Sequence, residues 1–176
     1  MDVETLCRGA DRVGVTVREA QSRDRDGIRE ALIASGAFTE EEVGVALEIF
    51  DLGLLGGLEG DYPVFVAESG GLVRGYVCVG RTPLTISTWH LYWICVHPDA
   101  QNKGVGRALQ GYAEDFIRSR GGQRVVLETS GKPSYSLARN FYHAAGYVTV
   151  GRILDFYKPG DDCLVYCKAL EPPPPA

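Results

Sequence analysis

The chain has 176 residues, of which 45% are apolar and 23% are charged, and its formal net charge is −5 at pH 7. These values predict one soluble globular domain at 1–170 with a Pro-rich tail at 171–176. The acidic balance argues against nucleic acid as a partner, and no apolar run is long enough to span a membrane. Because the segment Met1–Arg12 lacks a secretory signal, we expect a cytoplasmic protein.

Histidines and cysteines give no sign of a metal centre. The three histidines are scattered, and the five cysteines have no C-x-x-C spacing. The sequence therefore predicts no bound metal and reduced thiols.

The first part of the chain is predicted to contain a strand and two helices. Alternating valines predict a strand over Val13–Val17. Ser22 offers an N-cap for a helix that reaches Ser35, and Thr39 with Glu42 forms a capping box for a second helix. The glycine-rich stretch Gly53–Gly60 is expected to end that helix and to form a mobile loop.

The middle of the chain reads as a hairpin, a strand, a helix and a short strand. The hairpin joins Tyr62–Glu68 to Leu72–Gly80, and the next strand is Thr88–Val96. A helix is expected from Gly104 to about Arg118, because apolar residues recur along one of its faces. The wholly apolar run Val125–Leu127 predicts a strand with both faces covered.

The last part is predicted to hold a helix and two strands around a loop. The helix begins at Ser134 or Ser136 and ends before Gly146. The complete order, β-α-α-β-β-β-α-β-α-β-β, predicts a mixed α+β fold with helices packed on a sheet. The final strands are Tyr147–Ile153 and Cys163–Leu170, and the loop between them is Asp155–Asp162.

The segment that follows Val96 is the strongest functional signal. It reads V-H-P-D-A-Q-N-K-G-V-G-R and leads into a predicted helix. Gly104 and Gly106 permit a tight turn, and the first amides of the helix then point at one place, which suits a phosphate. A bare G-x-G is more often an ordinary loop, and the sequence has neither the third glycine of a dinucleotide fingerprint nor the G-K-S/T of a P-loop.

The spacing V-x-P-x-x-Q-x-x-G-x-G, on Val96, Pro98, Gln101, Gly104 and Gly106, resembles the acetyl-CoA pyrophosphate loop of the GCN5-related N-acetyltransferase (GNAT) superfamily. The resemblance implies a mostly antiparallel seven-stranded sheet flanked by four helices. It also implies that the fourth and fifth strands, here Thr88–Val96 and Val125–Thr129, splay apart around the pantetheine arm. The cofactor-binding residues it suggests are Cys95, Val96, Gln101, Asn102, Lys103, Gly104, Val105, Gly106, Arg107, Tyr135 and Tyr142. For Lys103 and Arg107 a surface role is equally open, and Tyr135 stands where many members have Asn.

A second resemblance concerns the leaving thiolate. The run Ala138-Arg139-Asn140-Phe141-Tyr142 with Gly146 is similar to the A-x-x-F-Y-x-x-x-G element of the family. The tyrosine of that element commonly donates a proton or hydrogen bond to the coenzyme sulfur. This role falls on Tyr142, and the alternative is a tyrosine that only packs against the sheet.

The general base and the acceptor site are less determined. His90 has an ordinary pKa near neutrality, and W-H-L-Y-W-I-C-V resembles the corresponding strand of serotonin N-acetyltransferase. Glu128 is the competing base. Aromatic and acidic residues at Asp155–Asp162 suit a cationic amine, or they form a plain turn.

The function expected from the resemblance is direct acetyl transfer from acetyl-CoA to a primary amine of a small molecule, amino acid or protein N-terminus. Two alternatives stay open, which are transfer of another acyl group and a non-catalytic CoA-binding module. A Cys95 acyl intermediate is weighed against a buried core thiol, which is favoured. The resemblance also leaves a homodimer open.

Overall fold

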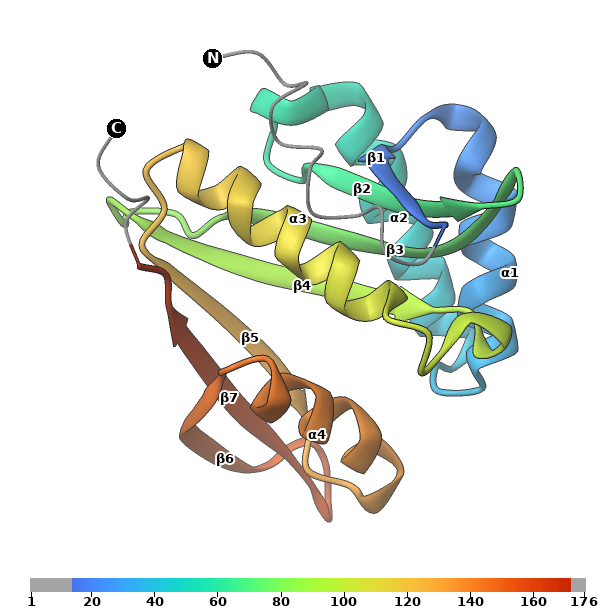
Figure 1. Cartoon of the computed structure of the whole chain (residues 1–176). Coiled ribbons are helices and arrows are strands. Elements are labelled where there is room, and N and C mark those ends of the chain that lie inside the picture. The colour runs from blue at the N-terminus through green and yellow to red at the C-terminus, as the bar shows by residue number, and fades with distance from the viewer. Residues whose placement is uncertain (1–13, 172–176) are drawn as a thin grey trace. The chain divides into compact units, whose positions relative to one another are not determined.

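The structure is a computed structural model that describes residues 14–171, and these contain seven strands and four α-helices in the predicted order (Figure 1). Val13, Cys7, Met1–Arg12 and the end of the Pro-rich tail lie outside the described residues. The strands are β1 (Thr16–Glu19), β2 (Val64–Ser69), β3 (Leu72–Arg81), β4 (Thr88–Val96), β5 (Arg124–Ser130), β6 (Val148–Lys158) and β7 (Asp161–Ala169). The helices are α1 (Arg25–Ser35), α2 (Glu40–Gly56), α3 (Val105–Ser119) and α4 (Ser136–Ala144), with short 3-10 turns η2 (Ser22–Asp24), η3 (Gly57–Glu59), η4 (Pro98–Ala100) and η5 (Pro133–Tyr135).

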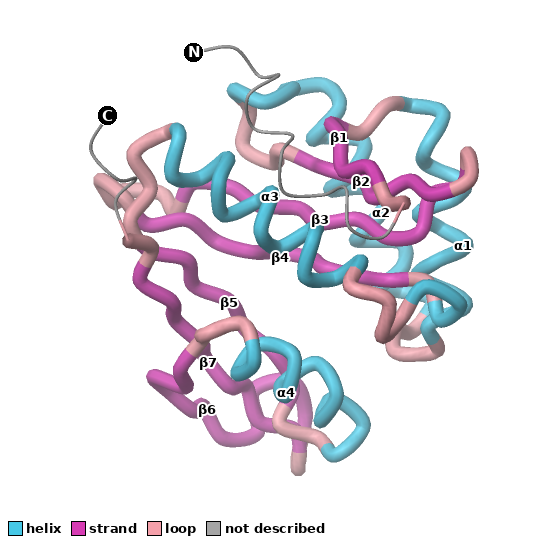
Figure 2. The backbone as a smooth tube through the Cα atoms, viewed as in Figure 1, coloured by secondary structure: helices cyan, strands magenta, loops and turns pink. Residues whose placement is uncertain are grey.

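One seven-stranded sheet has the order β1-β2-β3-β4-β5-β7-β6, which confirms the predicted mixed α+β architecture (Figure 2). The pairs β1–β2, β2–β3, β5–β7 and β6–β7 are antiparallel, and β4–β5 is parallel. The β4–β5 register covers only three residue pairs, from Thr88 with Arg124 to His90 with Val126. Both strands run on beyond that point, so the pairing between them is partial.

The described chain divides into two compact units. We call residues 14–80 and 93–116 the N-unit, and residues 81–92 and 117–171 the C-unit. Strand β4 and helix α3 each contribute to both. No helix in residues 14–171 combines the length and the apolar character that a bilayer crossing requires.

In the N-unit, helices cover both faces of the strands, with α3 on one face and α1 and α2 on the other (Figure 1). Helix α3 buries Val105, Leu109, Ala113 and Phe116, which recur at helical spacing. The ring of Phe65 on β2 lies 4.9 Å from that of Phe116. These contacts hold α3 against the sheet from Val105 at its start to Phe116 near its end.

Two local predictions about α1 and α2 need correction. Ser22 does not cap α1, because it begins the turn η2, and the helix starts only at Arg25. The stretch Gly53–Gly60 is not a loop, since α2 continues to Gly56 and η3 follows. A Cβ on Gly53 would lie 2.3 Å from the carbonyl oxygen of Tyr62, so this glycine is a packing contact within the helix.

The capping box at the start of α2 is confirmed. The Glu42 carboxylate accepts from the Thr39 main-chain N–H at 2.7 Å, and the Thr39 hydroxyl accepts from the Glu42 N–H at 3.3 Å. This reciprocal pair satisfies two amides that the helix itself leaves unbonded.

In the C-unit, α4 covers one face of β5 and β7 (Figure 1), and no other complete α-helix of residues 81–92 and 117–171 is available to cover the opposite face. Tyr142 of α4 packs 5.9 Å from the ring of Tyr166, whose neighbour across the ladder is Leu127. Leu127 is buried, whereas Val126 is half-buried and Glu128 is exposed. The expectation that this strand is covered on both faces is therefore wrong, and the apolar run reflects burial on one face only.

The predicted loop Asp155–Asp162 is also mostly strand. Strand β6 continues to Lys158 and β7 begins at Asp161, so only Pro159 and Gly160 form the turn. Between Ile153 and Lys158 the ladder is irregular, and Asp155 has a left-handed φ of 52°. The aromatic residues of this segment are part of a bulged strand end.

Gly75 on β3 is a close-packing point that the sequence did not reveal. A Cβ there would lie 2.6 Å from the carbonyl oxygen of Cys95 and 3.2 Å from Cα of Val96. The glycine lets β3 pass close to the end of β4, which leads into the candidate phosphate loop.

Gly75→Ala is expected to destabilise the protein by about 1–3 kcal/mol, because the added methyl group overlaps a main-chain oxygen that cannot move alone. Urea unfolding measures the change. Gly44→Ala is the matched control, since Gly44 lies inside α2 with nothing within 4 Å of the added Cβ. There we expect a gain of about 0.5–1 kcal/mol from helix propensity. Equal stabilities of the two variants would contradict the packing role of Gly75.

Candidate functional site

The loop between β4 and α3 forms a tight turn at the start of a helix. After Val96, η4 occupies Pro98–Ala100, and α3 begins at Val105. Asn102 and Gly104 adopt left-handed φ values of 59° and 83°. Such a turn fits glycine and asparagine, and it brings the chain into the helix with its first amides pointing outward.

Hydrogen bonds fix the turn from within. The His97 main-chain N–H donates to the Arg74 carbonyl at 2.8 Å, and the ring Nδ1 of His97 accepts from the Asp99 N–H at 3.2 Å. The side-chain amide of Gln101 donates to the Val96 carbonyl at 3.2 Å. Gln101 therefore braces the loop with its side chain, a role that the motif alone did not specify.

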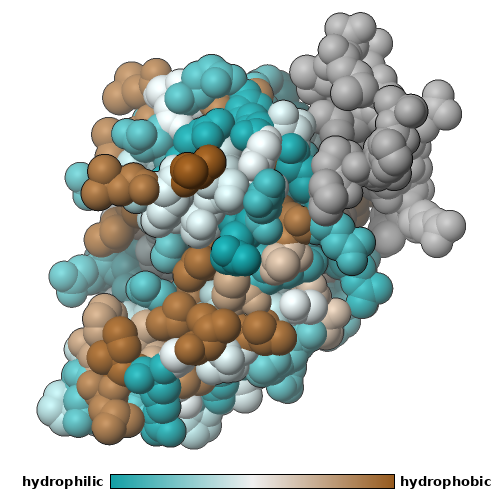
Figure 3. All heavy atoms as spheres, turned by 90° about the vertical axis from the view of Figure 1, so that its left-hand side faces the viewer, coloured by the Kyte–Doolittle hydropathy of each residue, from teal (hydrophilic) through white to brown (hydrophobic). Residues whose placement is uncertain are grey.

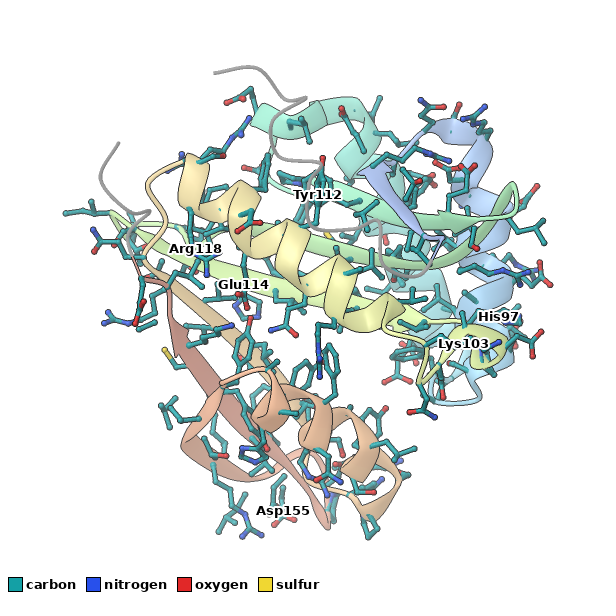
Figure 4. The ribbon with its side chains drawn as sticks, in the orientation of Figure 1. His97, Lys103, Tyr112, Glu114, Arg118 and Asp155 are labelled. Atoms are coloured by element: carbon teal, nitrogen blue, oxygen red, sulfur yellow. The ribbon has the colours of Figure 1, made fainter. Side chains whose placement is uncertain are left out.

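The loop presents polar groups to solvent and anchors itself with one apolar residue. Val105 is 2% exposed, whereas the side chains of Gln101, Asn102, Lys103 and Arg107 are exposed. Figure 4 shows Lys103 on the loop that leads into α3. The first-turn amides, the helix dipole and two nearby cations together suit a phosphate group.

Cys95, at the end of β4, is a buried thiol. Its Sγ donates to the Ala31 carbonyl at 3.5 Å, and burial raises its pKa to about 12. A thiol held protonated in this way is a poor nucleophile. These properties agree with a core thiol and disfavour an acyl-cysteine intermediate.

Tyr142 of α4 is buried among aromatic rings in the C-unit. It is 8% exposed, and the rings of Phe141, Tyr147 and Tyr166 lie 5.7, 6.0 and 5.9 Å away. Burial, reinforced by Tyr166, raises the pKa of the Tyr142 hydroxyl well above its ordinary value. The hydroxyl therefore stays protonated at neutral pH and can donate to an anion. Tyr135 lies at the N-cap of the same helix and is half-buried.

His90 and Glu128 lie on the helix-free face of the C-unit. His90 is opposite Val126 in the ladder, and Glu128 is two residues further along β5, so their side chains share that face. The His90 ring stacks on Tyr92 with centroids 4.7 Å apart. Burial lowers the pKa of His90, and Glu128 opposes this shift. The imidazole is thus neutral near pH 7 and able to accept a proton.

Sequence reasoning missed one residue that shapes the entry to α4. The guanidinium of Arg139 donates to the carbonyls of Ser130 and Lys132, at 2.9 and 2.6 Å. It thereby holds the segment that joins β5 to α4. Arg139 belongs to the A-R-N-F-Y run, so its position could have marked it, but the resemblance assigns a role only to the tyrosine of that run.

Metal ligation has no candidate in this part of the chain. Within residues 14–171, no group of three or more His, Cys, Asp or Glu side chains could hold a metal ion. The four described cysteines, Cys78, Cys95, Cys163 and Cys167, are free thiols.

Comparison with protein families gives a match to the acetyltransferase (GNAT) domain over residues 60–149. The match includes the β4–α3 loop, both strands that carry His90 and Glu128, and Tyr142. It therefore covers all the site residues that the sequence predicted, from His90 to Tyr142.

Two curated relatives match parts of the chain. A mycothiol acetyltransferase from Beutenbergia cavernae is 39% identical over 64 residues, which are 36% of this chain and 21% of that protein. The L-amino acid N-acyltransferase MnaT from Escherichia coli is 31% identical over 94 residues, 52% of this chain and 54% of the relative. The matched segments thus span about a fifth and about half of these relatives.

Among solved structures, a Desulfovibrio desulfuricans protein assigned to the GNAT family is 36% identical, with a TM-score of 0.84. The match covers 88% of this chain and 98% of that one. More distant structures of the same fold, 16–22% identical, are described with acetyl-CoA or coenzyme A. From the family match, the agreement over nearly the whole chain and the loop that opens α3, the chain belongs to the GNAT acetyltransferase family.

Proposed function

We propose that this chain is an acetyl-CoA-dependent N-acetyltransferase that transfers the acetyl group directly to a primary amine. The observation that carries the proposal is the turn at Asn102–Gly104. This turn leads into α3 with the first amides of the helix pointing outward, and the chain belongs to the GNAT family. The proposal extends to a single domain at 1–170 and to a cytoplasmic location. The exposed Val148 and Val150 at the start of the edge strand β6 support a homodimer.

The coenzyme diphosphate is assigned to the main-chain amides of Asn102–Arg107. Lys103 and Arg107 add positive charge beside them, and the main chain of Cys95 and Val96 is assigned to the pantetheine amides. Tyr135 is a further candidate contact on the C-unit. Binding through amides places little demand on side chains, which is why small residues occupy the turn.

Direct transfer requires a nucleophilic nitrogen, a stabilised oxyanion and a protonated leaving group. The amine nitrogen forms a bond to the thioester carbonyl carbon, and the carbon–sulfur bond then breaks. Tyr142 is assigned the proton or hydrogen bond that the departing thiolate receives, because burial keeps its hydroxyl protonated. The buried Cys95 thiol supports direct transfer over an acyl-enzyme route.

His90 is assigned the proton that the acceptor ammonium loses. Its lowered pKa leaves the imidazole neutral, and its ring is held by the stack on Tyr92. Glu128 is the alternative base, since it lies on the same face of the neighbouring strand.

Gly106→Glu is expected to abolish acetyl-CoA binding, because a carboxylate in the first turn repels the diphosphate and fills the space beside its amides. Isothermal titration calorimetry measures the affinity. Gly111→Glu is the matched control, since Gly111 is exposed on the same helix with open space around an added Cβ. That variant should bind as the parent does. Unchanged affinity in Gly106→Glu would remove the loop from the site.

Tyr142→Phe is expected to lower the rate of thiol release from acetyl-CoA by about 10²–10⁴-fold, with acetyl-CoA affinity nearly unchanged. The assay follows free thiol in the presence of a mixed panel of primary amines. Tyr166→Phe removes a hydroxyl from a neighbouring buried ring and controls for lost packing. Thiol release absent with every amine, despite acetyl-CoA binding, would favour a non-catalytic binding module.

The pH dependence tests the base. Below its pKa, His90 is an imidazolium without a lone pair, so kcat/KM of the parent should fall on the acid side, at a pH below the ordinary histidine value of 6.5. His90→Gln should lose this acid limb together with most of the turnover. His143→Gln, on the exposed side of α4, should keep the limb. An acid limb that persists in His90→Gln would transfer the role to Glu128.

A further inference from the structure

The helix-free face of the C-unit carries one free carboxylate. Strand alternation and ladder register place His90, Glu128 and Val165 on this face, with Cys163 two residues from Val165 on β7. Glu128 is exposed, and among residues 14–171 its side chain has no hydrogen bond and no ion pair. A strand-centre carboxylate that is neither paired nor covered is available to a ligand.

The other carboxylates beside this face are engaged within the protein. Asp155 accepts from the Gly160 N–H at 2.6 Å. Asp161 accepts from the Ser130 hydroxyl and lies 3.0 Å from Lys132 Nζ. Asp162 accepts from Arg152 Nε at 2.6 Å and from the Asp155 N–H at 2.8 Å. These acids build the β6–β7 turn, which favours the plain-turn interpretation for them.

Two aromatic rings border the same face. Asp155 has a left-handed φ in the irregular part of β6. Burial and the nearby Cys163 and Glu128 raise the pKa of the Tyr157 hydroxyl well above its ordinary value, which puts this hydroxyl beside Cys163 and Glu128. The Phe156 ring stands at 88° to that of Tyr157 with centroids 5.0 Å apart. The two side chains are 51% and 48% exposed, so they form an open aromatic wall.

Figure 3 shows apolar side chains gathered in its lower half, where Figure 1 places β6 and β7. Exposed apolar residues of β6 include Ile153 and Leu154 as well as the two aromatic residues. Apolar side chains therefore make up part of the surface around the wall, alongside the exposed Arg152, Asp155 and Lys158.

Three basic side chains near the β6–β7 turn have partners within the protein. Lys132 pairs with Asp161, and Arg152 pairs with Asp162. Arg139 donates to two main-chain carbonyls. The C-unit face thus offers a carboxylate for an ammonium group, but these cations are not available to bind a carboxylate of the acceptor.

We infer that this face is the acceptor subsite and that it selects a monocationic amine with an apolar or aromatic body. The inference rests on the proposed function and narrows its acceptor. Glu128 binds the ammonium group beside His90, and Phe156 with Tyr157 contacts the body. A zwitterionic amino acid brings its own carboxylate toward Glu128, and a polyamine leaves its further charges unpaired.

The test compares thiol release from acetyl-CoA with phenethylamine, phenylalanine, propylamine and spermidine. The parent should prefer phenethylamine in kcat/KM. Glu128→Gln should raise KM for phenethylamine roughly ten- to hundredfold, the value of a hydrogen bond to a charged group, with kcat little changed. The Glu128→Gln variant should also have a smaller ratio of kcat/KM for phenethylamine to kcat/KM for phenylalanine than the parent. Tyr157→Ala should reduce the ratio of kcat/KM for phenethylamine to kcat/KM for propylamine.

Glu19→Gln, which removes one exposed carboxylate at the end of β1, is the control and should leave all ratios unchanged. A loss of kcat rather than KM in Glu128→Gln would make Glu128 the base and overturn its binding role. A parent that prefers phenylalanine or spermidine, or ratios unmoved by both variants, overturns the inference while the acetyltransferase function stands. Release with none of the amines overturns the proposed function and the inference together.

Discussion

The candidate cofactor site depends on how strand β4 ends. Gly75 allows β3 to pass within contact of Cys95 and Val96, and the His97 amide is tied to Arg74 of the same strand. The chain leaves the sheet at a fixed point, turns through two left-handed residues and begins α3 with its first amides unbonded inside the helix. A side chain at position 75 or a right-handed residue at 104 would move those amides. The capacity to hold an anion is therefore a property of the main-chain path.

Acid–base chemistry is assigned to the other compact unit, where burial sets the protonation states. Tyr142 is kept protonated by the rings around it, and His90 is kept neutral by its partial burial despite Glu128 nearby. The same physical effect, desolvation of the charged form, acts on an acid and on a base and leaves both uncharged near neutral pH. A proton donor and a proton acceptor can thus coexist without either being ionised beforehand.

Sequence reasoning predicted the element order, strand β4 to the residue and the capping box of α2, because these follow from local periodicity and hydrogen-bonding patterns. The predictions from sequence were wrong where contacts between residues far apart in the chain determine the local structure. Gly53 looked like a helix terminator but is a point of close approach to Tyr62, and the run Val125–Leu127 looked doubly buried although α4 covers one face. At the site, the motif indicated which residues to consider. It could not show that the Gln101 side chain donates to the Val96 carbonyl or that the Asp162 carboxylate accepts from the main-chain N–H of Asp155.

The Asp162 carboxylate accepts from the Asp155 N–H, and the Asp155 carboxylate accepts from the Gly160 N–H, so the chain's own polar groups hold the β6–β7 connection. Its conformational entropy is lost when the protein folds, so a ligand resting there has little ordering left to impose. The aromatic side chains of residues 156 and 157 take no part in those carboxylate bonds, so they could be replaced without breaking the bonds that hold the turn. A single scaffold could in this way be adapted to acceptors of different shape by exchanging two side chains at its rim.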